Sequence, residues 1–428
     1  MELYTQILSS GCTAHTRPAS HYRTAYPHVE LCTVGASVGF GSANTRTISH
    51  TTRLCAFVHT AATSGKILLG VCQSAVSKIT QKYLTNLVTG APAYVTVYAN
   101  NVCQLRCDMC FYWDAMQQAP QEITLTQATQ LGLSLKGVLH ISVSGGEPTL
   151  RKDLVEFVSL LCKHSNAPRC SVLTNGFQTK HVVSQVKEIV RRNPGTEVTI
   201  RVSIDGTEQV HDRIRGIRGS YRRAISTYRQ LRRLSTCDAY ANLNVDINTC
   251  ISRWNYDDFD TFCEEVKLLN PCHHSVTITR GKTKEPDAAD IPESAVTKVM
   301  KYVRGQRPKK WNEQMVGRVR DVMYDEIERI IKHNTHKYNC KAGKRFATVY
   351  QDGSVHSCEI LNTIHPDQSS LLGNLNDVDW DIRRVLDSQT AHDVKKFICN
   401  KKCFCTFENA KFTDVVYTPS LLAKVITK

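Results

Sequence analysis

Residues 100–113 read Asn-Asn-Val-Cys-Gln-Leu-Arg-Cys-Asp-Met-Cys-Phe-Tyr-Trp, so that Cys103, Cys107 and Cys110 are separated by three and then two residues. This spacing lets one short loop direct three thiolates at one centre. A four-iron cluster takes four ligands, and three cysteines leave one iron open to another group, much as a catalytic zinc keeps an open position. Cys107 and Cys110 alone would also fit a redox dithiol or half a zinc site; Cys103 favours the cluster.

The sequence around this loop predicts an α/β fold. From residue 91 onward, short runs rich in β-branched residues alternate with longer stretches of helical periodicity, which is typical of βα units with a parallel sheet. The predicted strands are residues 93–99, 138–143, 171–174, 198–204, 243–248 and 275–279. The predicted helices between them include residues 153–163, 181–192, 221–234 and 257–269. Six such repeats predict a partial (β/α)6 barrel of the TIM type, with its chemistry at the carboxyl ends of the strands.

Three further polar motifs follow predicted strands. The second strand ends in Ser-Gly-Gly-Glu-Pro at 144–148, the third in Thr-Asn-Gly at 174–176, and the fourth in Ser-Ile-Asp-Gly at 203–206. The two glycines of the first motif allow the backbone to approach a ligand closely, and Glu147 supplies negative charge. Gly-Gly-Glu-Pro by itself would be an ordinary turn, but its position one strand after the cysteine loop favours a binding role.

The cysteine loop, followed by Phe111 and Tyr112 and then by the Gly-Gly-Glu-Pro turn, resembles the radical S-adenosylmethionine (SAM) superfamily. The resemblance covers roughly residues 90–410. It implies that SAM binds the open iron and is cleaved reductively to methionine and a 5′-deoxyadenosyl radical, with the protein holding the parts in line. The cofactor contacts that it implies are Tyr112, Gly145, Gly146, Glu147, Asn175, Ser203 and Arg215. No catalytic base is indicated.

The resemblance gives these contacts separate roles. Tyr112 is expected to meet the adenine, Glu147 and its glycines the amino group of SAM, and Ser203 the ribose or carboxylate. Arg215 is expected to pair with the SAM carboxylate, although a solvated surface position is the alternative. Asp205 is expected to cap or brace its loop rather than touch SAM.

The C-terminal part carries a second group of cysteines. Cys340, Gly353 and Cys358 resemble the start of the SPASM/Twitch domain, which holds auxiliary iron–sulfur clusters in peptide-modifying radical SAM enzymes. A hairpin of residues 348–350 and 355–357, turned at Asp-Gly, would bring the two thiols together. The spacing is looser than in a full SPASM domain, so one auxiliary cluster is expected, with a zinc ribbon as the alternative. Its ligands are expected to be Cys340, Cys358, Cys403 and either Cys399 or Cys405.

These motifs divide the chain into five parts. They are an unassigned extension at 1–88, a radical SAM core barrel at 89–310, a helical connector at 311–335, an auxiliary-cluster domain at 336–412 and a tail at 413–428. The extension is poor in acids and rich in Ser and Thr, a composition shared by disordered segments and organellar transit peptides.

Composition excludes several classes of protein. The 18 cysteines in 428 residues are too few for a disulfide-stapled scaffold, and the sequence has no secretory signal or membrane-spanning apolar run. A cytoplasmic, reducing environment is therefore expected. The formal charge of +15 is concentrated partly in 213–233 and 301–345, which are predicted as solvated helix faces or as a surface for an acidic partner.

The leading hypothesis is hydrogen abstraction from a peptide or protein side chain, with an electron donor such as flavodoxin or ferredoxin. Radical modification of a nucleotide or RNA is the alternative that the positive charge supports. A non-catalytic iron–sulfur electron carrier is a third hypothesis, but a carrier has no use for an open iron.

Overall fold

The computed structural model of the chain describes residues 81–427, apart from residues 82, 84, 307–310 and 336. Most of the predicted extension at 1–88, with its transit-like composition, therefore lies outside the described residues. All of the described residues belong to one structural unit. No helix in this part of the chain is long and apolar enough to cross a membrane.

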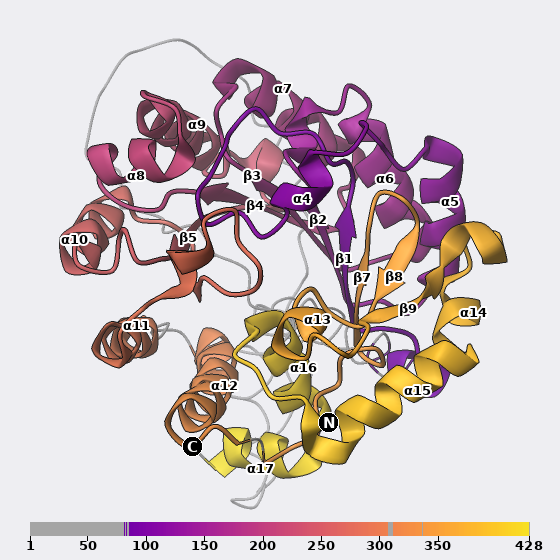
Figure 1. The fold of residues 1–428 in the computed structure, drawn as a ribbon. Helices are drawn as coiled ribbons and strands as arrows, with labels where there is room; N and C mark the ends of the chain where they lie inside the picture. The colour runs from indigo at the N-terminus through magenta and orange to yellow at the C-terminus, as the bar shows by residue number, and fades with distance from the viewer. Residues whose placement is uncertain (1–80, 82, 84, 307–310, 336, 428) are drawn as a thin grey trace, which may run out of the picture. The chain divides into compact units, whose positions relative to one another are not determined.

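Six parallel strands form the first part of the sheet, as the sequence predicts (Figure 1). They are β1 (Tyr94–Tyr98), β2 (His140–Ser144), β3 (Arg169–Thr174), β4 (Glu197–Ser203), β5 (Leu243–Ile251) and β6 (His274–Ile278), and they neighbour one another in chain order. Burial alternates along β4: Val198, Ile200 and Val202 are buried, while Arg201 and Ser203 are only half-buried. This alternation follows from the two-residue period of a strand and leaves polar side chains on one face of the sheet.

Helices pack against the apolar face. They are α5 (Leu125–Ser134), α6 (Leu154–Ser165), α7 (Thr179–Arg192), α8 (Glu208–Arg215), α9 (Ser220–Leu234) and α10 (Phe259–Leu269). In Figure 1, α5, α6, α7 and α9 follow one another along this side of the sheet. Helix α5 begins at a capping box of Thr124 and Gln127, and α6 ends at Asn166 in the left-handed conformation. These local signals fix where the helices start and stop.

Three strands from the C-terminal part continue the same sheet. They are β7 (Phe346–Val349), β8 (Ser354–His356) and β9 (Leu371–Asn374). The β7–β8 hairpin is the one that the sequence predicts, but β7 also pairs in parallel with β1, with Thr96 opposite Thr348. One hydrophobic cluster runs from Val95 of β1 to Cys358 and Cys405. The cysteine-rich region therefore shares its sheet and its core with the barrel.

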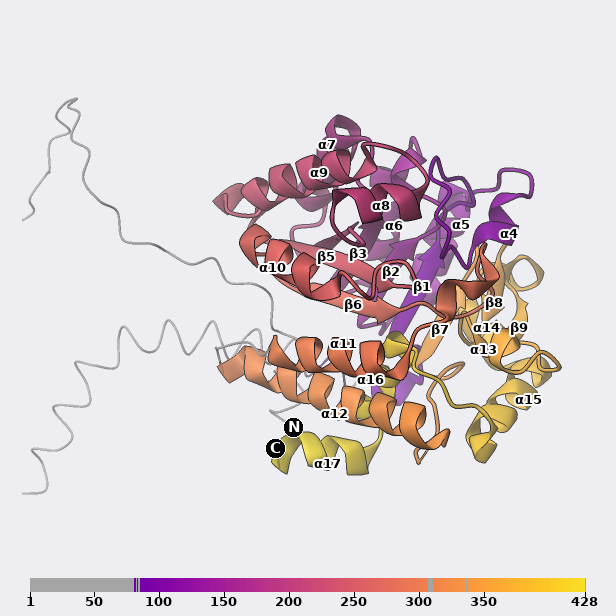
Figure 2. The same cartoon turned by 60° about the vertical axis from the view of Figure 1, so that its left-hand side comes forward.

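A second helical layer lies beside these elements. It comprises α11 (Glu293–Gly305), α12 (Trp311–His333), α16 (Glu408–Tyr417) and α17 (Pro419–Thr427), and α11 and α12 run side by side in Figure 2. The shorter helices are α4 (Trp113–Met116), α13 (Leu361–Ile364), α14 (Ile382–Leu386) and α15 (Gln389–Phe397). Helix α16 crosses the boundary expected at residue 412, and the described part of the 413–428 tail is helical.

Candidate functional site

The cysteine loop follows β1 directly, and groups from the ends of other strands reach its sulfur atoms. The backbone N–H of Leu105 donates to Cys103 Sγ at 3.4 Å, and Asn175 Nδ2, after β3, donates to the same sulfur at 3.8 Å. Arg215 Nη1, at the end of α8, lies 3.7 Å from Cys107 Sγ. Such N–H donors stabilise sulfur that carries negative charge.

The three thiols are poorly solvated. Burial raises the pKa of Cys103 and of Cys110 to about 12, and it raises that of Cys107 as well. A buried thiol becomes a thiolate only when a strong positive charge replaces its proton, which is what an iron centre supplies. The donor set therefore fits a cysteine-ligated iron–sulfur cluster. In the described part of the chain, no three His, Cys, Asp or Glu side chains are grouped to hold a single metal ion.

The glycine turn after β2 packs tightly on the start of this loop. Gly146 N donates to Asn100 O at 3.0 Å, and Glu147 N donates to Val102 O at 2.7 Å. A Cβ on Gly145 would lie 2.7 Å from Asn100 O, and one on Gly146 would lie well inside van der Waals contact with Val102 O. The sequence pattern predicts that the two glycines make room for a ligand, but the close approach to the cysteine loop already requires them.

Glu147 is almost fully buried, and groups of the chain itself occupy both of its carboxylate oxygens. Oε1 accepts from Thr149 N at 3.1 Å and from the Thr174 hydroxyl at 2.8 Å, and Oε2 accepts from Asn175 N at 2.7 Å. Glu147 thus ties the end of β2 to the end of β3. It acts on Cys103 through Asn175, a connection that the motif alone did not reveal.

Arg215 is held by Asp205, which braces its loop as expected. Arg215 Nε and Nη2 lie 2.6 and 2.5 Å from Asp205 Oδ2, and Asp205 Oδ1 accepts from Cys250 N at 2.9 Å. Asp205 is fully buried and Arg215 is 9% exposed, so Arg215 is not a solvated surface residue. The third nitrogen of its guanidinium is left to face Cys107.

Tyr112 follows the loop and packs in an aromatic group. Its ring lies 4.7 Å from that of Tyr98 and 5.9 Å from that of Tyr350, and its hydroxyl donates to Gln351. Ser203 is half-buried at the end of β4. No local pattern in the sequence indicates Tyr350 or Gln351, because they reach Tyr112 through the pairing of β7 with β1.

Four of the five C-terminal cysteines belong to one hydrophobic cluster. Cys340, Cys358, Cys403 and Cys405 are all buried, whereas Cys399 is exposed. Burial, followed by the negative charge of Cys405, raises the pKa of Cys358 to about 12, and the same two causes raise the pKa of Cys403. Burial, followed by the charge of Asp414, raises the pKa of Cys340, and the charge of Cys405 adds to this effect. The arrangement therefore favours Cys405 over Cys399, the choice that the sequence left open.

Replacing Gly146 by alanine is expected to lower the free energy of unfolding by about 1–3 kcal/mol, because the new Cβ must push the Val102 backbone away. Urea unfolding of the full chain measures this change. Gly195→Ala is the matched control, since nothing lies within 4 Å of the added methyl group. Equal stability of the two variants would contradict the close contact between the turn and the cysteine loop.

Part of the chain is similar in sequence to known proteins. Residues 97–266 match the sequence profile of the Radical SAM superfamily. The sporulation killing factor maturation protein SkfB of Bacillus subtilis is 26% identical over 176 residues, which are 41% of this chain and 39% of SkfB. The Fe-coproporphyrin III synthase of Methanosarcina barkeri is 28% identical over 200 residues, 45% of this chain and 46% of that protein. The chain thus spans less than half the length of these curated relatives.

A solved structure is similar in fold over more of the chain than residues 97–266. The crystal structure of Streptococcus suis SuiB bound to its precursor peptide SuiA is similar with a TM-score of 0.52, over 80% of each chain and at 15% sequence identity. The fold predicted from the sequence, a radical SAM partial barrel, is therefore confirmed.

Proposed function

We propose that this chain, which carries a radical SAM domain at residues 97–266, is an enzyme that cleaves SAM reductively at a four-iron cluster on Cys103, Cys107 and Cys110. The observation that carries the proposal is the convergence of N–H donors from Leu105 and Asn175 on the sulfur of Cys103, at the carboxyl end of β1. When bound, such a cluster donates one electron that breaks the C5′–S bond of SAM, giving methionine and a 5′-deoxyadenosyl radical.

The residues around the cysteine loop would hold the cluster in position for this electron transfer. Asn175 and Arg215 donate to two cysteine sulfurs and so offset the negative charge of the thiolates. Glu147 and Asp205 are positioning residues, because each holds one of these donors by buried hydrogen bonds. Gly145, Gly146, Ser203 and Tyr112 remain the proposed contacts of SAM itself.

The proposed substrate is a peptide or protein side chain. SkfB is named as a maturation protein, and SuiB was solved with a precursor peptide, which supports this choice. The buried group of Cys340, Cys358, Cys403 and Cys405 supports one auxiliary iron–sulfur cluster. A reductant such as flavodoxin or ferredoxin would supply the electron. The similarity to Fe-coproporphyrin III synthase indicates that the core alone does not fix the substrate.

Modification of a nucleotide or RNA is the second candidate, favoured by the formal charge of +15 and by the exposed arginines Arg222, Arg229 and Arg233 of α9. The buried face of α9 packs against the barrel, so that these arginines face solvent. Binding to RNA that weakens steeply with salt would support this candidate. Binding that is absent at low salt would contradict it.

The proposed activity is tested with the full chain, reconstituted anaerobically with iron and sulfide and supplied with SAM and dithionite. Formation of 5′-deoxyadenosine is the expected result. Incubation with candidate peptides then asks whether their mass changes in step with deoxyadenosine. Absence of deoxyadenosine would contradict the proposed enzyme and favour an electron carrier, whereas deoxyadenosine without any change in a peptide would contradict only the substrate.

A further inference from the structure

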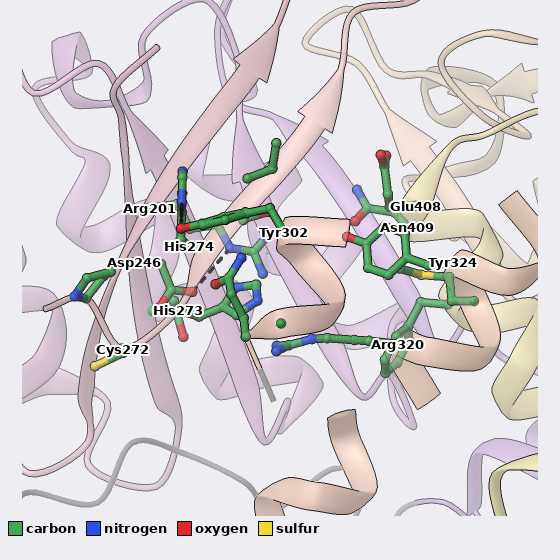
Figure 3. Close-up of a pocket in the computed structure, with 18 of the residues that line it drawn as sticks. Arg201, Asp246, Cys272, His273, His274, Tyr302, Arg320, Tyr324, Glu408 and Asn409 are labelled. Carbon is green, nitrogen blue, oxygen red and sulfur yellow. Dashed lines mark hydrogen bonds and ion pairs between the residues drawn. The ribbon is translucent and has the colours of Figure 1, made fainter. Parts of the chain in front are cut away.

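A large cavity lies at the opposite end of the strands from the cysteine loop. Its volume is about 1410 Å³, and the first residues of β1, β2 and β3, namely Tyr94, His140 and Arg169, line it. Residues of α11, α12 and α16 line its other side (Figure 3). None of the residues proposed to hold the cluster or SAM contributes to it. We call it the arginine cavity, because Arg169, Arg201 and Arg320 all face it.

The three guanidinium groups are incompletely neutralised. Arg169 Nε lies 3.6 Å from Glu197 Oε1, and Arg201 Nε lies 3.9 Å from Asp246 Oδ2; both separations exceed a hydrogen bond. Arg320 extends from α12 toward the strands (Figure 3). Among the ion pairs of the described residues, none involves Arg320. Three guanidinium groups against two carboxylates leave one positive charge unmatched.

Several polar atoms of the side chains that line the arginine cavity lack a hydrogen-bond partner. Buried polar atoms without a partner among the described residues include Tyr94 OH, Arg169 Nη2, Arg201 Nε and Gln306 Nε2. Each of these atoms can donate a hydrogen bond, and the three nitrogens can only donate. Buried polar groups are nearly always satisfied, so a set of unsatisfied donors around one cavity indicates a ligand that brings oxygen acceptors.

Two histidines limit how much negative charge this ligand carries. Burial, followed by the charges of Arg320 and Arg201, lowers the pKa of His273 well below its usual value. Burial, followed by the charges of Arg201 and Arg169, does the same for His140. Both rings are therefore neutral near neutral pH and add no positive charge. One unmatched guanidinium charge suits a monoanionic group such as a carboxylate better than a phosphate dianion.

We propose that the arginine cavity binds a side-chain carboxylate of the peptide substrate, so that the enzyme selects an acidic peptide. This inference rests on the proposed function in one respect, namely that the substrate is a peptide. His140 and Ser144 stand at opposite ends of β2, and four residues at ~3.3 Å each separate them by about 13 Å. The cavity therefore anchors a part of the substrate several residues away from the reacting atom, and such remote binding positions the substrate.

The test measures the binding of two seven-residue alanine peptides, acetylated and amidated at their ends, that carry either glutamate or glutamine at the centre. Titration calorimetry uses the reconstituted full chain with SAM bound. We expect the glutamate peptide to bind at least about tenfold more tightly than the glutamine peptide, which is the effect of one charge-assisted interaction. Arg320→Gln is expected to remove this difference. Lys301→Gln, which removes an exposed charge at the rim, is expected to preserve it.

Four outcomes would overturn the proposal: equal binding of the two peptides, no binding of either, an unchanged preference in Arg320→Gln, or tighter binding of inorganic phosphate than of the glutamate peptide. The last result would favour a phosphorylated ligand.

Thermal unfolding of both variants shows whether they are folded. If Arg320→Gln is unfolded, Arg201→Gln replaces it as the test variant. Deoxyadenosine formation is measured in parallel. Selective peptide binding without deoxyadenosine formation contradicts the proposed activity alone. Deoxyadenosine formation without selective peptide binding contradicts only the proposed role of the arginine cavity.

Discussion

Replacing Cys107 by alanine is expected to remove about four irons from each reconstituted chain and to reduce 5′-deoxyadenosine formation to background. Cys107 is the middle one of the three proposed ligands, and Arg215 donates to its sulfur from within a buried ion pair. Two cysteines would then face four irons, which is too few to retain the cluster and direct its open iron. Iron and sulfide analysis with an anaerobic assay of SAM cleavage measures both effects.

Cys237→Ala is the matched control for this variant. Cys237 is an exposed cysteine shortly after α9, far in sequence from both cysteine groups, and its sulfur lies 3.7 Å from the Arg233 carbonyl oxygen. The control is expected to keep its full iron content and activity. If Cys107→Ala retained all of its iron while still cleaving SAM, the proposed cluster site would be wrong.

Replacing Cys405 by alanine is expected to remove the iron of the auxiliary site, about four of about eight per chain, while Cys399→Ala leaves the iron content unchanged. The two residues lie six positions apart, but only Cys405 is buried with Cys340, Cys358 and Cys403. The SAM cluster remains in both variants, so each is expected to form deoxyadenosine without substrate. Iron analysis and the electron paramagnetic resonance spectra of the reduced chains distinguish the two sites.

The paired variants also separate iron from zinc. A zinc ribbon at the C-terminal cysteines would bind one zinc per chain and leave about four irons in the wild type. Loss of iron in Cys399→Ala, with its retention in Cys405→Ala, would reverse the ligand assignment. Equal loss in both would show that Cys399 moves into the site when the cluster forms.

The sequence predicted the features of the fold that local patterns determine. All six barrel strands and the four named helices form where periodicity indicated them, because buried strands and amphipathic helices carry their own spacing signals. The Asp352-Gly353 turn likewise determined the β7–β8 hairpin. The parallel pairing of β7 with β1 was not foreseen. It joins residues about 250 positions apart, and no local signal encodes such a contact.

The same division holds for the candidate site. Spacing alone identified Cys103, Cys107 and Cys110, because one loop carries all three. Spacing did not show that Glu147 acts through Asn175, because the two residues follow different strands. It also left Cys399 and Cys405 equivalent, since only the burial of Cys405 distinguishes them. The arginine cavity was missed entirely, because Arg169, Arg201 and Arg320 come from three separate elements.

The β1–β7 pairing places the two cysteine-bearing regions in one continuous sheet. β1 carries the loop that holds the first three cysteines, and β7 covers its otherwise open edge. A chain cut before β7 would expose the N–H and C=O groups of β1, and exposed strand edges recruit other chains into aggregates. The C-terminal region therefore covers the exposed edge of the strand that leads into the cysteine loop, whatever chemistry its own cysteines perform.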